Sequence, residues 1–228
     1  MNLSLNYIDD NMTEIMANKW DNIEKNAEDF LKNQEEYHQN NVLAFNHEKT
    51  IFMINSKKKK HRNKKISFNN KHIEHSTKVK ILGTIYNDNL SFKNHIEKGM
   101  SNKKSLIVRL KQKLCLIKKI KYWMNTKELK IIANSYVNGI IQYGILCWAK
   151  NNHKLIEKVE KLRIKIIKAI HDNDETKDLN RDQILNLMNW NSIEDARTIA
   201  ENVRIHKIIA TKKPVMKYND YTDNRTSE

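Results

Sequence analysis

The spacing of the apolar residues changes near residue 92, and this change limits the folds open to the chain. Before residue 92, short apolar runs separated by turns predict strands, and one stretch with a helical period, residues 19–40, predicts a single helix. After it, apolar residues recur at steps of three and four, as at Leu106, Leu110 and Leu114, which predicts helices throughout. The sequence therefore predicts an α+β fold: a helix packed on a small antiparallel sheet, followed by a helical bundle.

Turn residues and helix caps give the expected boundaries of these elements. A first hairpin has strands over residues 3–7 and 12–17, with Asp9, Asp10 and Asn11 in its turn. Further strands are expected at 50–55, 64–68, 72–75 and 78–86. Helices are expected at 98–127, from 125 to about 148, and at 153–170, 178–189 and 192–210. The predicted segments are 1–91, 92–150, 151–212 and a disordered tail, 213–228.

The net charge of +15 is divided unevenly along the chain. Residues 1–50 hold ten acidic and four basic residues, a balance of −6, and residues 51–228 hold 17 acidic and 38 basic residues, a balance of +21. A basic excess of this size favours a polyanionic partner, and the acidic first segment suits a metal site that serves a nucleic-acid channel. Codon usage rich in A and T would also enrich lysine, but it does not explain the asymmetry.

The two cysteines and the acidic N-terminal residues indicate where the protein resides. Cys115 and Cys147 stand alone, without the spacing of metal ligands, which favours a reducing compartment and argues against zinc. Asp9, Asp10 and Glu14 occupy the region where a signal peptide would be basic and then apolar. We therefore expect an intracellular protein, nuclear or cytoplasmic.

Residues 131–149 contain no charged residue and have the length of a membrane span. Asn134, Asn138 and Gln142 interrupt this run, and they are costly in a bilayer. A buried helix of the bundle is the better interpretation, so we expect no membrane partner.

Two basic segments are candidates for binding nucleic acid. Residues 57–65 contain seven Lys or Arg residues, which can contact phosphates, act as a nuclear localisation signal, or form a solvated loop. Residues 98–127 contain ten Lys or Arg residues and no acidic one, and because the apolar stripe faces a core, the cations are expected to gather on the remaining face. The alternative there is a solvated helix. The candidate residues are Lys57, Lys58, Lys59, Lys60, Arg62, Lys103, Lys104, Arg109, Lys111, Lys113, Lys118 and Lys119.

An acidic pair follows an aromatic residue in the sequence Tyr7-Ile8-Asp9-Asp10. Acidic pairs in turns are usually solvated, but carboxylates at the tip of a rigid hairpin are suitable ligands for the Mg²⁺ ions of phosphoryl transfer. One hairpin supplies only part of the cage that two such ions need.

The order of these motifs resembles the C-terminal half of a non-LTR retrotransposon reverse transcriptase, from Tyr7 to about residue 150 and more loosely to about 210. Tyr7 to Asp10 resembles the aromatic-x-Asp-Asp palm motif. The segment 46–50 resembles Asn-Pro-x-Lys-Thr, with His47 in the place of the proline. Residues 79–83 resemble the primer-grip strand, and Thr126 to Leu129, Tyr143-Gly144 and Trp148 are similar to the helical thumb and the region after it.

The resemblance implies a partial palm over residues 1–91, thumb-like helices over 92–150 and a C-terminal helical region over 151–212. It implies template-directed nucleotide addition, with Asp9 and Asp10 as Mg²⁺ ligands and Lys49 as a proton donor near the departing pyrophosphate. It also implies that Leu82 and Gly83 are primer-grip-like and that the partner is an RNA or DNA template–primer duplex.

The family's third metal-binding aspartate and its fingers would precede Met1. We therefore expect a truncated RNA-directed DNA polymerase that is inactive alone and binds Mg²⁺ weakly. Self-association through an exposed sheet edge is also expected, because unpaired strands invite pairing. The alternative is a nucleic-acid-binding module without catalysis, or a decayed transposon product without function.

Overall fold

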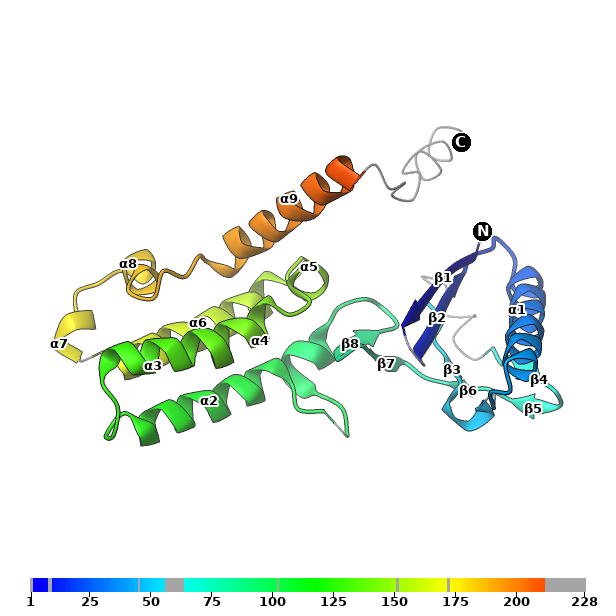
Figure 1. The fold of residues 1–228 in the computed structure, drawn as a ribbon, viewed down its shortest axis with the longest axis horizontal. Helices are drawn as coiled ribbons and strands as arrows, with labels where there is room; N and C mark the ends of the chain where they lie inside the picture. Colours follow the sequence, from blue (N-terminus) through cyan, green and yellow to red (C-terminus); the bar gives the residue numbers. More distant parts are fainter. Residues whose placement is uncertain are drawn as a thin grey trace. The chain divides into compact units, whose positions relative to one another are not determined.

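The computed structural model describes residues 2–7, 10–44, 46–55, 64–101, 103–150, 152–171 and 173–211. The chain divides into two compact units, whose elements are labelled in Figure 1. The first unit comprises residues 1–81 and 86–90, and the second comprises residues 82–85 and 91–228. Short strands and one long helix occur in the first unit and helices dominate the second, which confirms the α+β class. The predicted tail, 213–228, lies outside the described residues.

A β-hairpin opens the first unit. Its strands β1 (Asn2–Tyr7) and β2 (Asp10–Ile15) pair antiparallel, with Tyr7 opposite Asp10. Asp10 and Asn11 therefore lie in a strand, not in the expected turn. Asp9 lies outside the described residues.

The helix predicted over residues 19–40 is confirmed as α1 (Trp20–Asn40). Its apolar positions recur every three or four residues, so that one face is buried while the rest is solvated. The core of the first unit forms against this face. Its buried members are Trp20, Ala27, Leu31, Ile66 and Phe68.

The other strands of the first unit differ from the single antiparallel sheet that was predicted. A 3-10 turn, η1 (His47–Lys49), precedes β3 (Ile51–Phe52), which pairs parallel with β6 (Glu74–His75). β4 (Ser67–Phe68) and β5 (Lys71–His72) form a separate antiparallel pair. Within the described residues all sheets are two-stranded. Strands of two residues are too short to build a wider sheet.

A second hairpin lies where one interrupted strand was predicted. β7 (Lys78–Ile81) pairs with β8 (Thr84–Asn87) across a turn of two residues, Leu82 and Gly83. Both turn residues have positive φ, 44° and 85° respectively, as a type I′ turn requires.

The second unit consists mainly of helices, and several begin at side-chain caps. Ser105 caps α2 by accepting from the Val108 N–H, and Asn125 caps α3 in a capping box with Glu128. The predicted helix 98–127 is therefore wrong at both ends, since α2 covers only its middle. The elements are η3 (Asn94–Lys98, π-helical), α2 (Leu106–Ile120), α3 (Thr126–Ala133), η4 (Asn134–Asn138, π-helical), α4 (Gly139–Gln142), α5 (Ile145–Trp148), α6 (His153–Ile170), α7 (Asn173–Thr176), α8 (Arg181–Asn186) and α9 (Ile193–Thr211).

One core joins the helices before and after residue 150. The apolar stripe of α2 packs against α6, and α3 and α8 also contact α6. Residues 131–149 contribute buried positions to the same core, among them Val137, Ile141 and Trp148. The uncharged run thus belongs to the bundle, but it is divided among α3, η4, α4 and α5, so the single helix predicted from 125 to about 148 is wrong. No helix in the described part of the chain is long and apolar enough to cross a membrane.

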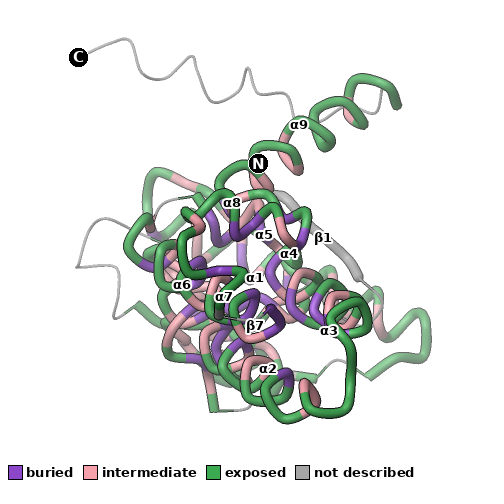
Figure 2. The backbone as a smooth tube through the Cα atoms, turned by 90° about the vertical axis from the view of Figure 1, so that its left-hand side faces the viewer, coloured by how far each residue is buried: buried purple, intermediate pink, exposed green. Residues whose placement is uncertain are grey.

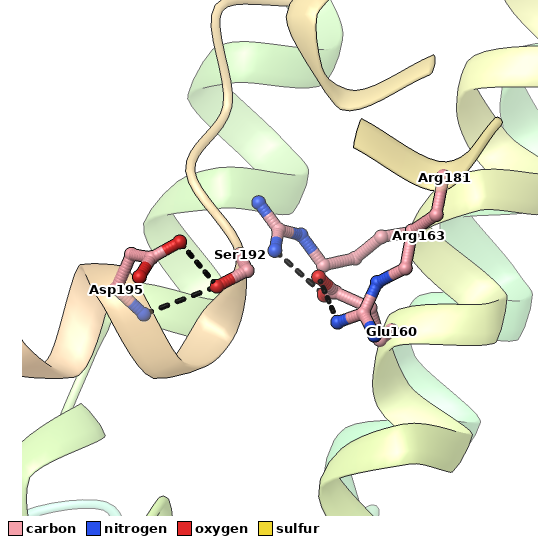
Figure 3. A network of polar contacts seen from close by, with 5 residues as sticks. All are labelled: Glu160, Arg163, Arg181, Ser192 and Asp195. Carbon is pink, nitrogen blue, oxygen red and sulfur yellow. Dashed lines mark hydrogen bonds and ion pairs between the residues drawn. The ribbon is translucent and has the colours of Figure 1, made fainter. Parts of the chain in front are cut away.

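An ion pair is buried within this core (Figure 3). Glu160 and Arg163 on α6 are each 2% exposed or less, and Arg163 Nη1 lies 2.7 Å from Glu160 Oε2. Arg181 on α8 reaches the other carboxylate oxygen at 3.1 Å. Arg163 also lies over the Trp190 ring, 5.0 Å from its centroid. Charge and packing together thus join α6 to α8 and to the segment before α9. That last helix is mostly exposed beyond Ile193 (Figure 2).

Candidate nucleic-acid interface

An open groove of about 770 Å³ lies on the second unit. Three segments line it: the loop before α2, one flank of α2, and the η4–α4 segment. Among the described residues that line it, four are cationic and none is acidic. The lining residues are Lys103, Lys104, Arg109, Gln112, Lys113, Ser135, Tyr136, Gly139, Ile140 and Tyr143.

The helical period of α2 determines which of its cations reach the groove. Its buried stripe includes Leu106, Leu110 and Ile117. Arg109 and Lys113, four residues apart, lie on one side of that stripe and line the groove. The α2 cations are therefore spread over the surface that the buried stripe leaves, and Arg109 and Lys113 are the two that line the groove. Lys111, Lys118 and Lys119 are exposed elsewhere on the helix.

A glycine forms the loop that carries the other two cations. Gly99 has a φ of +78°, and a Cβ there would lie 2.6 Å from the Lys103 carbonyl oxygen. A side chain at this position would collide with backbone, so the turn requires glycine. Met100 and Lys103 then exchange two backbone hydrogen bonds of 2.8 and 3.1 Å, which place Lys103 and Lys104 just before α2.

The turn of Leu82 and Gly83, which the resemblance predicts to be primer-grip-like, contacts two residues that line the groove. The Tyr143 hydroxyl donates a hydrogen bond to the Leu82 carbonyl. A Cβ at Gly83 would lie 3.2 Å from Lys103 Nζ and 3.5 Å from the Tyr143 ring. Leu82, Gly83, Lys103 and Tyr143 are far apart in sequence, yet the structure brings them to one place.

The field around the groove is positive. Lys113 Nζ lies 4.6 Å from the centroid of the Tyr136 ring, a cation–π contact. Within the described part of the chain, Lys104, Arg109 and Lys113 form no ion pair with a carboxylate. Cations without paired carboxylates are available to bind an anion.

His95 is a buried residue whose pKa is affected by two cations of the groove, Lys103 and Arg109. It is 3% exposed, and its Nδ1 accepts a hydrogen bond of 3.3 Å from the Ile85 N–H, which ties η3 to β8. Burial, together with the positive charges of Lys103 and Arg109, lowers the pKa of His95 to about 4. The imidazole is therefore neutral at pH 7.

The remaining predicted site residues belong to the first unit or to residues that the structure does not describe. Asp10 is the first residue of β2, and its side chain is not described, while Asp9 lies outside the described residues. Lys57, Lys58, Lys59, Lys60 and Arg62 also lie outside them. Within the described residues, no group of three or more His, Cys, Asp or Glu is placed to hold a metal ion.

Lys49 is exposed at the end of η1, in the segment that resembles Asn-Pro-x-Lys-Thr. The Asn46 side chain accepts from the Lys49 N–H at 3.1 Å, and the Thr50 hydroxyl donates to the Asn46 carbonyl at 2.9 Å. Asn46, Lys49 and Thr50 therefore form a capped turn, which holds the backbone of Lys49 in place.

Sequence reasoning missed Gln112, Ser135 and Tyr136 as groove residues. A signal was present for the aromatic pair, since Tyr136 and Tyr143 lie seven residues apart in the uncharged run 131–149. In an α-helix that spacing would be about two turns, which predicts both rings on one side. Both do line the groove, although a π-helical segment, η4, and the end of α4 lie within this stretch. Gly139 lies between them, and a Cβ there would meet nothing within 4 Å.

Comparison of the chain with protein-family models, with curated proteins and with solved structures finds no match.

Proposed function

We propose that the groove binds the backbone of a nucleic-acid duplex, and that the second unit is the thumb-like part of a protein related to non-LTR retrotransposon reverse transcriptases. The observation that carries this proposal is the composition of the groove. Four cations and two tyrosines surround it, its described lining contains no acid, and the Leu82–Gly83 turn lies at its edge. A surface of this kind contacts phosphates and sugars and does not read base sequence.

The motif order supports the same proposal from the first unit. The backbones of Tyr7 and Asp10 pair at the end of the first hairpin, and a hairpin end is the kind of place in which the proposal puts the acidic pair. In the proposed lineage reaction Asp9 and Asp10 would hold Mg²⁺, and Lys49 would lie near the departing pyrophosphate. Mg²⁺ would supply charge neutralisation at the transferred phosphate. Capture of the template–primer duplex is the part of the reaction assigned to the groove.

Two triple variants with equal loss of charge test the assignment. The groove variant combines Lys104→Ala, Arg109→Ala and Lys113→Ala, and the control combines Lys111→Ala, Lys118→Ala and Lys119→Ala on the same helix but outside the groove. A blunt-ended RNA–DNA hybrid carrying a fluorophore serves as the probe, with anisotropy measured from low to moderate salt.

The groove variant should lose affinity for the hybrid. Each phosphate contact releases about 0.9 counterion on binding, so the loss of three contacts should make the slope of log Kobs against log salt shallower by roughly 2 to 3. The control should change the slope by less than about 1. Equal losses in both variants, or heparin competing as well as the hybrid, would show a nonspecific polycation instead, which is the alternative of a module without duplex preference.

A further inference from the structure

Two aromatic side chains project into solvent at the turn between α2 and α3. Tyr122 is 84% exposed and Trp123 is 81% exposed, and Met124 beside them is 38% exposed. The other three tryptophans are at most 7% exposed. Large aromatic side chains dominate core and interface energetics, so two of them in solvent mark a site of interaction more than a structural need.

The turn holds these rings in a defined arrangement. Lys121 and Trp123 donate backbone hydrogen bonds of 2.9 Å to Ile117 and Ile120, the last turn of α2. The capping box of Asn125 then begins α3 at once. The two rings meet edge to face, with centroids 5.1 Å apart and planes at 82°. A short, capped turn therefore presents the aromatic tip, residues 122–124, with little freedom left to lose on binding.

The charge around the aromatic tip selects the kind of partner. Lys118, Lys119, Lys121 and Lys127 flank it, and residues 118–127 contain no acid. The first acid beyond them, Glu128, accepts from the Asn125 N–H as part of the capping box. Lys118, Lys119 and Lys127 are exposed. Aromatic rings among exposed lysines are the elements that proteins use to stack bases while contacting the phosphates of a single strand.

We propose that the aromatic tip is a stacking site for single-stranded nucleic acid, in which Trp123 and Tyr122 contact bases and Lys118, Lys119 and Lys127 contact phosphates. The site is separate from the groove, about 10 Å further along the axis of α2. A membrane surface is the weaker alternative, because the apolar stripe of α2 is buried in the core and leaves only the tip itself to insert.

Tryptophan fluorescence reports on this site selectively, since Trp123 is the exposed one of the four. A single-stranded oligothymidylate should quench the emission and a blunt duplex should quench it much less. Trp123→Ala should lower the affinity for the labelled oligonucleotide about 10-fold by anisotropy. Trp123→Phe should keep the affinity within about threefold while the quenching disappears, because phenylalanine still stacks but does not emit in the same range.

The fluorescence and binding measurements have outcomes that support or overturn the stacking site. Unchanged circular dichroism is expected in both variants, since the side chain is exposed. The groove variant should keep the quenching by oligothymidylate, so that the two proposals fail or stand separately. Quenching that is equal for duplex and single strand, or an unchanged affinity in Trp123→Ala, would overturn the proposal. A blue shift with phosphatidylserine vesicles, without quenching by the oligonucleotide, would replace it with a membrane surface.

Discussion

His95 is a buried base held close to two cations, and its surroundings make stability depend on pH. Its pKa is about 4 in the folded protein against 6.5 for an ordinary histidine, mainly because burial disfavours the charged ring. Between these values the unfolded chain binds a proton that the folded chain does not. The contribution of neutral His95 to the free energy of unfolding is therefore full above about pH 6.5 and is lost as the pH falls toward 4.

We expect the free energy of unfolding to fall by about 2 kcal/mol between pH 7.5 and pH 5 on account of His95 alone. Urea denaturation at both values, for the natural chain and for His95→Asn, isolates this share, because Asn can still accept the Ile85 N–H but does not titrate. The other eight histidines are common to both proteins and cancel in the comparison. Equal losses in the two proteins would contradict the assignment.

The end of α1 shows what the sequence could and could not predict for a single residue. The pattern over residues 19–40 predicts the helix within one residue of its bounds. It does not predict how the helix closes, because Val42 occupies the left-handed position, with φ of 57°, where a glycine would have marked the end. Leu43 donates to the His38 carbonyl at 2.7 Å and Val42 to the Gln39 carbonyl at 3.1 Å, the two bonds of a Schellman motif. Val42 is 95% exposed, so no burial explains the choice.

At the scale of elements, α6 depends on its buried ion pair. Burial lowers the pKa of Arg163, and the adjacent Glu160 opposes that shift. Removing one partner of such a pair leaves a buried charge without compensation, whereas replacing both by apolar groups is often tolerated.

Glu160→Ala should therefore destabilise the second unit by about 3 kcal/mol or more. The combination of Glu160→Leu with Arg163→Met should recover most of that loss, since both charges leave together. Arg181→Ala should cost less than about 1 kcal/mol, because its side chain is 52% exposed. Chemical denaturation followed by circular dichroism measures all three. A double variant as unstable as Glu160→Ala would mean that the pair is needed for its shape, beyond its charge balance.

The helix α2 was predicted in kind but not in extent. Its apolar spacing is visible in the sequence, but the basic run continues on both sides with the same composition. The structure begins the helix only after Gly99 and the Met100–Lys103 turn, and ends it before the aromatic tip. The glycine at positive φ and the serine cap are signals of one residue each. The apolar and basic pattern continues across both of them, so the pattern alone does not predict where the helix begins.

At the scale of the whole molecule, the charge pattern of the sequence predicted the cations of the groove, whereas only the folded structure shows the shape of the groove. The basic pattern of the sequence predicted Lys103, Lys104, Arg109 and Lys113 among its candidates. It did not separate them from Lys111, Lys118 and Lys119, because only the position of η4 and α4 beside one flank of α2 decides which cations line the groove. That information resides in long-range packing, which residue periodicity does not contain.

The acidic pair leads to a prediction about metal for the whole chain. Asp9 and Asp10 are like charges adjacent in the sequence, and Mg²⁺ keeps most of its water unless a shaped cage removes it. We expect calorimetry with Mg²⁺ or Mn²⁺ to show no saturable site of micromolar affinity, and a primed template to gain no labelled nucleotide. A tight site that disappears in Asp9→Asn would mean that a further ligand completes the cage.

The shared core across residue 150 has a consequence for how such a chain can be inherited. α2 buries Leu106, Leu110 and Ile117 in the same cluster as Val159 and Ile166 of α6. A gene fragment that stops after α5 would encode α2 with η3 and η4 but without α6, and part of its apolar stripe would be uncovered. A break between α5 and α6 would therefore separate two halves that each expose part of one core.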